Sequence, residues 1–167
     1  MALMKDERTL WLTQSAVIAA LYAVFTLILP VNAAGTVEFR ISEALTMIAA
    51  LTPAAVPGLT IGCVLANILH GAALLDVIFG SLATLLAAAA TYLTRKNIWV
   101  AAVWPAVFNG LIVGLLLKYV YQMEMSLPLL MLSVAAGELV ICYVLGIPLV
   151  KLLEKTSLFR KEKKGSR

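Results

Sequence analysis

A long apolar run in the middle of the chain extends from Leu75 to Thr94. It reads LDVIFGSLATLLAAAATYLT, and its one charged residue is Asp76. About 20 residues of α-helix, rising about 1.5 Å each, reach about 30 Å, which is the thickness of the hydrocarbon core of a bilayer. The stretch therefore predicts a transmembrane helix.

Five other apolar segments flank this stretch, so we predict an all-α, polytopic membrane protein with six transmembrane helices. Prolines, glycines and short polar connections separate the segments, and consecutive helices are expected to be antiparallel neighbours. In chain order, the predicted segments are Thr9–Leu29, Val37–Leu51, the stretch from after Pro57 to Ala73, Leu75–Thr94, Ile98–Leu117 and Pro128–Val150. Residues 1–155 then form one membrane domain, and residues 156–167 form a basic tail.

The composition excludes a soluble enzyme and a disordered chain. Hydrophobic residues make up 62% of the 167 residues and charged residues 13%, whereas a soluble domain is about half apolar and about a quarter charged. A chain of this length has too little interior to hide that much apolar surface. Cys63 and Cys142 lie in apolar runs and form no Cys-x-x-Cys spacing, so we expect no disulfide framework and no metal site. We also expect no cofactor.

The basic residues predict the orientation of the chain in the membrane. With six spans, eleven of the thirteen Lys and Arg residues lie on the side of the two termini. Because cytoplasmic loops carry an excess of Lys and Arg, both termini are expected in the cytoplasm. Seven of the basic residues lie in residues 151–167, and this tail suits anionic lipid rather than a nucleic acid.

Polar side chains from four segments are expected to lie in one layer of the outer half of the membrane. Helical rise places Glu43 and Asn67 about 9 Å deep, Asn109 about 12 Å and Glu138 about 15 Å. The inner half holds few polar residues besides Ser and Thr, which favours a pocket open to the outside over a continuous channel. The candidate substrate-binding residues are Glu38, Arg40, Glu43, Asn67, His70, Asp76, Asn109 and Glu138.

Several of these residues also have a purely structural interpretation. Arg40 and Glu43 are three positions apart on a predicted helix and could form a pair. Asn109 could bridge two helices by hydrogen bonding, and Asp76 could cap a helix. His70, the single histidine, could be a satisfied interior group rather than a metal ligand.

Glu138 is the hardest of the candidates to explain as structural. It lies in the middle of a predicted span without an obvious local partner. A carboxylate in apolar surroundings is costly unless it is hydrogen-bonded, so a ligand or a donor from another helix must stabilise Glu138.

The first segment carries a stripe of small residues that includes Ala16, Ala20 and Ala23. Such a stripe lets another helix approach closely. It is either an internal packing face or a docking face for a partner subunit.

The chain lacks the motifs that support ATP hydrolysis or covalent catalysis. No G-x-x-x-x-G-K-[ST], H-E-x-x-H or G-x-S-x-G motif occurs. Ser42 and His70 are the closest approach to a nucleophile and a base, and no third group orients them. We therefore expect no enzyme activity, and a pocket without a motor needs a partner for uphill transport.

Three quoted stretches carry a resemblance to a known family. Residues 38–46 read EFRISEALT, residues 52–59 read TPAAVPGL and residues 76–84 read DVIFGSLAT. Together with Ile61-Gly62-Cys63 and Ala66-Asn67, they resemble the QueT family over about residues 9–155. The resemblance implies a substrate-binding (S) component of an energy-coupling factor (ECF) transporter for queuosine precursors.

The resemblance also implies partners and a cargo. The partners are a transmembrane coupling (T) subunit and two ABC-type ATPases, and Ala16, Ala20 and Ala23 would meet the T subunit. Residues 30–36 and 118–127 would act as lids. The cargo would be a 7-deazaguanine such as preQ0, preQ1 or queuine.

The chemistry of a 7-deazaguanine suits the candidate residues. The base presents an N–H and an amino group side by side, and the carboxylate of Glu138 or Glu43 can accept both. A cationic substituent on the base would be balanced by Glu38 or Asp76. Candidate donors to the ring carbonyl oxygen are Arg40, Asn67, His70 and Asn109.

Three rival hypotheses remain open from the sequence. A stand-alone secondary transporter of a small heterocyclic nutrient would need a polar route on both sides of the layer. A membrane enzyme would need a nucleophile–base pair, and a structural subunit would bind no ligand.

Overall fold

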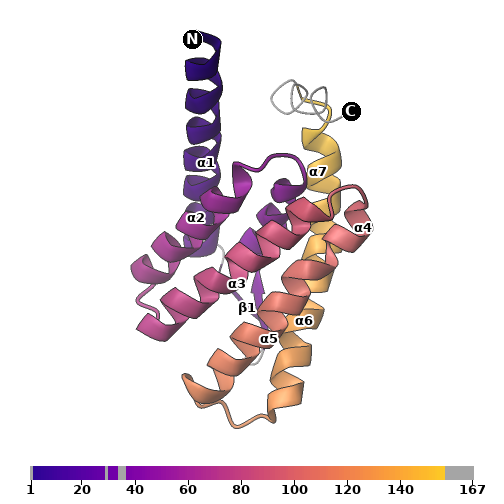
Figure 1. Ribbon diagram of the computed structural model, residues 1–167. Coiled ribbons are helices and arrows are strands. Elements are labelled where there is room, and N and C mark those ends of the chain that lie inside the picture. Colours follow the sequence, from indigo (N-terminus) through magenta and orange to yellow (C-terminus); the bar gives the residue numbers. More distant parts are fainter. Residues whose placement is uncertain (1, 29, 34–36, 157–167) are drawn as a thin grey trace.

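A computed structural model describes residues 2–28, 30–33 and 37–156, and most of these residues are helical (Figure 1). In chain order, the elements are α1 (Ala2–Ile28), β1 (Pro30–Ala33), β2 (Val37–Arg40), the 3₁₀-helix η1 (Ile41–Ala50), α2 (Ala55–Leu69), α3 (Leu74–Leu93), α4 (Ile98–Ala101), α5 (Val103–Tyr119), α6 (Leu127–Ile141), the π-helical turn η2 (Cys142–Gly146) and α7 (Ile147–Leu153).

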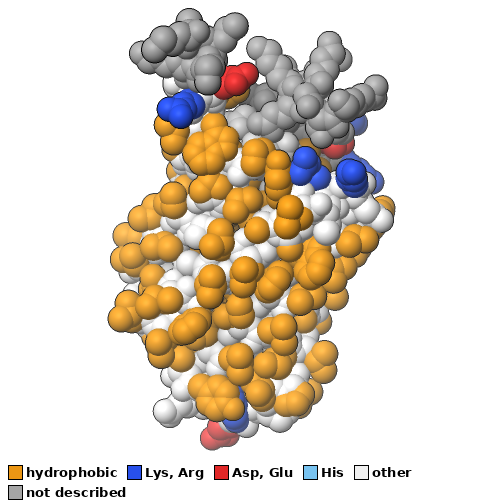
Figure 2. Space-filling model, viewed as in Figure 1, with side chains coloured by type: hydrophobic (Ala, Val, Ile, Leu, Met, Phe, Trp, Pro, Cys, Tyr) orange, Lys and Arg blue, Asp and Glu red, His pale blue; other side chains and the backbone are white. Residues whose placement is uncertain are grey.

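Four helical stretches are long and apolar enough to cross a membrane. They are Glu7–Ile28, Leu74–Leu93, Ile98–Tyr119 and Leu127–Leu153, and the shorter apolar helices Ile41–Ala50 and Ala55–Leu69 accompany them. Apolar side chains cover the middle of the visible surface, whereas most Lys and Arg side chains gather toward one end (Figure 2). The helical, polytopic character of the prediction is confirmed, and the count of six spans stays a prediction.

The predicted single helix over Val37–Leu51 is wrong at its start. Val37–Arg40 is a strand that pairs antiparallel with Pro30–Ala33, so that Pro30 faces Arg40 and Ala33 faces Val37. Val and Phe residues favour such extended backbone. The helix begins only at Ile41, and it is a 3₁₀-helix, which rises about 2.0 Å per residue and is therefore longer than an α-helix of the same ten residues.

The last two predicted segments are also interrupted. Helices α4 and α5 meet at Ala102, and the π-helical turn η2 separates α6 from α7. This turn precedes Pro148, the second residue of α7. Because proline has no backbone N–H and its ring crowds the preceding turn, a wider turn before it keeps the helix continuous.

The 3₁₀-helix η1 is the centre of the bundle. It contacts α1, α2, α3, α6, α7 and η2, and every residue from Ser42 to Ala49 is buried. Because other elements surround η1, none of the residues from Ser42 to Ala49 is exposed to lipid. Its one acidic residue, Glu43, is thereby placed in the interior.

Helices α1 and α2 cross closely because both present small residues at their contact. A Cβ atom added at Gly58 would lie 2.7 Å from the carbonyl oxygen of Ser15, and one added at Gly62 would lie 2.7 Å from that of Ala19. Such contacts leave no room for a side chain on α2. Small residues at crossings of this kind are typical of membrane helices, which gain stability from close packing.

The two ends of the described chain lie at the same end of the molecule (Figure 1). The start of α1 and the end of α7 are both at the top in that view, whereas the connection between α5 and α6 is at the bottom. The β1–β2 hairpin follows the lower end of α1.

The α1–α2 crossing gives a first testable prediction. Gly62→Ala puts a methyl group against the backbone of α1 and should lower the free energy of unfolding by about 1–3 kcal/mol, the usual cost of overpacking. Thermal unfolding of the purified protein in detergent measures it. Ala20→Leu, at an exposed position of α1, is the control and should leave the stability unchanged; equal effects of both variants would contradict the crossing.

Candidate functional site

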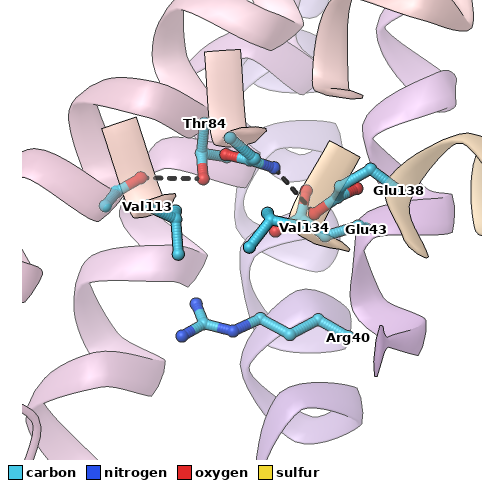
Figure 3. Close-up of a pocket in the computed structure, with 8 residues that line it drawn as sticks. Arg40, Glu43, Thr84, Val113, Val134 and Glu138 are labelled. Atoms are coloured by element: carbon cyan, nitrogen blue, oxygen red, sulfur yellow. Dashed lines mark hydrogen bonds between the residues drawn. The ribbon is translucent and has the colours of Figure 1, made fainter. Parts of the chain in front are cut away.

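A small pocket lies between η1, α3, α5 and α6 (Figure 3). Each of the three α-helices contributes two residues one turn apart, and residues four positions apart share one helix face. The free space among these side chains is about 10 Å³, close to the room that one water molecule needs. The lining residues are Arg40, Glu43, Gly80, Thr84, Asn109, Val113, Val134 and Glu138.

Glu138 of α6 meets Asn109 of α5 across the pocket. The side-chain amide Nδ2 of Asn109 donates to Oε1 of Glu138 at 2.9 Å. Both side chains are buried, with 3% and 8% of the surface of Asn109 and Glu138 exposed. Among the residues that the structure describes, the second oxygen, Oε2 of Glu138, is buried without a hydrogen-bond partner.

Glu43 is also buried, but both of its carboxylate oxygens have a partner. The hydroxyl of Tyr22 on α1 donates to Oε1, and the hydroxyl of Thr46, one turn along η1, donates to Oε2 at 3.0 Å. Glu43 is 2% exposed. The protein thus satisfies this carboxylate from within, and Glu43 has a structural role whether or not a ligand is bound.

Arg40 brings a positive charge to the same pocket. It is the residue that immediately precedes η1, and it is partly buried. Figure 3 shows its side chain extended below the carboxyl groups of Glu43 and Glu138 in that view. The pocket therefore combines two carboxyl groups, one guanidinium and one amide among apolar walls, and these groups can recognise a flat molecule with donors and an acceptor on its edge.

A second group of polar residues lies behind Gly80, on the α3 side of the pocket. Asp76 is 3% exposed, and its Oδ2 accepts a hydrogen bond from the Tyr121 hydroxyl at 2.7 Å. Burial and this hydrogen bond raise the pKa of Tyr121 to about 12, so its phenol stays protonated and donates. The amide Nδ2 of Asn67 lies 3.5 Å from the backbone oxygen of Asp76.

The structure brings most of the candidate residues together. Arg40, Glu43, Asn109 and Glu138 line one pocket, and a Cβ atom added at Gly80 would lie 2.8 Å from Asp76 Oδ1 and 3.4 Å from Asn67 Nδ2. Helix α3 has Ala73 as its N-cap residue, so the alternative role of Asp76 as that cap is wrong.

The remaining candidates lie elsewhere. His70 is exposed at the C-terminal end of α2 and does not line the pocket. The interpretation of the single histidine as an interior group is therefore wrong, because His70 caps the helix where the chain turns. Glu38 lies on β2, and its side chain is outside the described part of the chain.

The alanine stripe of α1 divides between two faces. Ala16 and Ala20 are exposed, whereas Ala23 is buried. Ala19, on the same side as Ala23, meets Gly62 of α2. The internal-packing interpretation therefore applies to Ala23, and Ala16 and Ala20 remain on a free face of the isolated chain.

Several residues that shape the site are not among the candidates predicted from the sequence. Gly80, Thr84, Val113 and Val134 line the pocket, and Tyr22 holds Glu43. The four-residue spacing from Asp76 to Gly80 and Thr84, from Asn109 to Val113 and from Val134 to Glu138 is visible in the sequence and could have indicated the first four. Tyr22 carries no such signal, because it meets Glu43 from a distant segment.

Comparisons with known proteins agree on one family. A family model described as QueT transporter matches residues 12–155. The chain is 36% identical over 84 residues to a protein of Lactococcus lactis subsp. cremoris (strain MG1363) named Queuosine precursor transporter QueT, and the aligned part is 49% of each chain. The match thus spans about half the length of that relative. No solved structure matches the chain.

The Tyr22–Glu43 contact gives a second prediction. Tyr22→Phe removes the donor to Oε1 of Glu43 and leaves a buried carboxylate oxygen with one partner fewer. The free energy of unfolding should fall by about 1–3 kcal/mol, as thermal or denaturant unfolding in detergent can measure. Tyr92→Phe is the control, because the Tyr92 ring that Arg95 covers is retained; a Tyr22→Phe protein as stable as this control would contradict the contact.

Proposed function

Because the chain belongs to the QueT transporter family, we propose that it is the substrate-binding (S) subunit of an ECF importer and captures a queuosine precursor of the 7-deazaguanine type. It binds and releases its cargo without covalent chemistry. One observation carries the proposal: in an apolar bundle, the Glu138 carboxyl group is oriented by Asn109 and keeps a buried oxygen, Oε2, without a partner in the described chain. A binding site leaves such an acceptor for its ligand.

The pocket groups can be matched to the edge of the base. The paired ring N–H and amino group donate to the Glu138 carboxylate, in a charge-assisted two-point contact. The Arg40 guanidinium donates to the neighbouring carbonyl oxygen, and Val113 and Val134 line the pocket as apolar walls. A base that lacks the paired donors would leave the carboxylate unpaired and be rejected.

The bound base needs more space than the pocket now holds. The free volume of about 10 Å³ suits one water molecule, so a bicyclic base enters only when side chains move aside. Arg40 is the long, partly exposed side chain among the lining residues. Side-chain rotamer changes of this kind are common on binding, and we propose that Arg40 swings to admit the base and then contacts it.

We further propose that the helical segments make six spans with both termini in the cytoplasm. The positive-inside rule supports this orientation, since Lys and Arg side chains gather toward the end of the molecule that holds the described ends of the chain (Figure 2). The pocket then opens to the outer side. The helices η1 and α2 are shorter than a membrane span usually is. In this proposal the longer helices around them cover their ends.

The energy for uphill transport is proposed to come from partner subunits. The chain has no phosphate-binding loop for ATP. A coupling (T) subunit and two ABC-type ATPases would supply the motor. The exposed residues Ala16 and Ala20 of α1 suit close approach of a helix of the T subunit.

Binding of a 7-deazaguanine tests the central proposal. The purified protein in lipid nanodiscs should bind 7-aminomethyl-7-deazaguanine in isothermal titration calorimetry, and Glu138→Gln should weaken binding at least tenfold, which is about 1.4 kcal/mol. The glutamine side chain has one acceptor oxygen and no negative charge, so it cannot replace the two-point contact that the carboxylate makes. Unchanged affinity in the Glu138→Gln protein would remove this residue from the site.

The matched control for this variant is Glu154→Gln. Glu154 is exposed at the end of α7, so the same chemical change there should leave the affinity unchanged. Uptake of the base by liposomes that contain this chain alone would instead support a stand-alone transporter.

The coupling face gives a further prediction. Ala20→Leu should leave the affinity of the isolated chain for the base unchanged. It should reduce uptake of the base severalfold in cells that make the T subunit and the ATPases, because the larger side chain keeps the partner helix at a distance. Radiolabelled uptake and co-purification of the T subunit measure the effect. Undiminished uptake and co-purification would place the docking face elsewhere.

A further inference from the structure

We propose that Asp76 forms a second subsite, which holds a positively charged substituent of the base. The cargo is then a 7-deazaguanine with a protonated amine on its side arm rather than a neutral one. This inference rests on the proposed function and deepens it, since it names the substrate class that the same pocket selects.

Asp76 is a buried carboxyl group with one oxygen that can still accept a hydrogen bond from a ligand. It is 3% exposed and lies in the first turn of α3. Tyr121 satisfies Oδ2, whereas Oδ1 is buried and, within the described residues, has no hydrogen-bond partner. A buried carboxylate oxygen without a donor is costly, so an unmet acceptor at this depth requires an explanation.

Gly80 connects Asp76 to the pocket. Gly80 is one of the lining residues, and a Cβ atom added there would lie only 2.8 Å from Asp76 Oδ1. Because Gly80 has no side chain, Asp76 Oδ1 lies directly against this pocket-lining residue. Asp76, Gly80 and Thr84 follow one another at four-residue spacing along α3, which places all three on one face of the helix.

The balance of charges favours a cationic ligand. Three buried carboxyl groups, of Glu43, Asp76 and Glu138, lie in or beside the pocket, and among its lining residues Arg40 is the basic one. One guanidinium can balance one carboxylate. A ligand ammonium group beside Asp76 would supply both a donor to Oδ1 and a charge opposite to that of the carboxylate.

Glu138 and Asp76, which each keep one oxygen without a donor in the described chain, recognise different parts of the base. Glu138 on α6 accepts from the ring edge, and Asp76 on α3 accepts from the ammonium group of the side arm. A neutral side arm, such as a nitrile, has no proton to donate and leaves Asp76 Oδ1 unpaired. Sites built around a buried charged acceptor reject analogues that lack the matching donor.

Two ligands and two variants test the subsite. Calorimetric titration in nanodiscs compares 7-aminomethyl-7-deazaguanine with 7-cyano-7-deazaguanine, whose side arm is neutral. The native protein should bind the aminomethyl compound at least tenfold more tightly. Asp76→Asn should lower the affinity for the aminomethyl compound at least tenfold and change the affinity for the cyano compound by less than threefold. Glu138→Gln should lower the affinity for both compounds.

The controls separate a binding role from a structural one. Tyr121→Phe removes the hydrogen bond to Oδ2 but keeps the carboxylate, so the preference for the aminomethyl compound should persist. Gly80→Ala brings a methyl group against Oδ1 and should reduce that preference, which also covers the case in which the Asp76→Asn protein does not fold.

Failure of the subsite and failure of the proposed function would give different results. Equal affinity of the native protein for the two compounds, or equal weakening of both by Asp76→Asn, would overturn the subsite while leaving the proposed function in place. Binding of neither compound would overturn both.

Discussion

Glu43 places a carboxyl group at the centre of an apolar bundle, and the rest of the structure depends on how that group is satisfied. This carboxyl group is buried, and a buried carboxyl group is costly unless it is hydrogen-bonded. Tyr22 reaches it from α1 and Thr46 from the next turn of η1. These bonds tie the short central helix to the first helix of the chain and fix the start of η1, where Arg40 enters the pocket.

The three buried carboxyl groups differ in how fully the protein satisfies them. Glu43 has a partner on each oxygen, whereas Glu138 and Asp76 each have a partner on one oxygen and, in the described chain, none on the other. The bonds that do form orient the two groups. In the proposed site, pre-orientation by Asn109 and Tyr121 would lower the ordering cost of binding, and the remaining acceptors would select the ligand.

Much of the helical fold could be predicted from the sequence, because apolar length is a strong signal for membrane helices. The stretch over Leu74–Leu93 matches its prediction almost residue for residue. The strand at Val37–Arg40 and the 3₁₀-helix after it could not be predicted in this way. Hydropathy alone does not distinguish a strand, a 3₁₀-helix and an α-helix over short apolar runs.

The site was predictable in part for the same reason. Depth along each helix grouped Asn109 and Glu138, which line one pocket, since helical rise converts sequence position into height. Glu43 lines the same pocket, although the residues from Val37 to Arg40 along which its depth was counted form a strand. Depth says nothing about which way a side chain faces, so His70 was grouped with them although it is exposed. The partner Tyr22 was not foreseen, because contacts between distant segments depend on the packing of the whole bundle.

The most direct measurement is a structure of the protein determined in lipid with a bound 7-deazaguanine. The expectation is density for the flat ring between Thr84 and Glu138, with the ring edge on Glu138 and the Arg40 side chain moved from its present position. Ring density outside the space bounded by η1, α3, α5 and α6, with Arg40 and Glu138 unchanged, would contradict it.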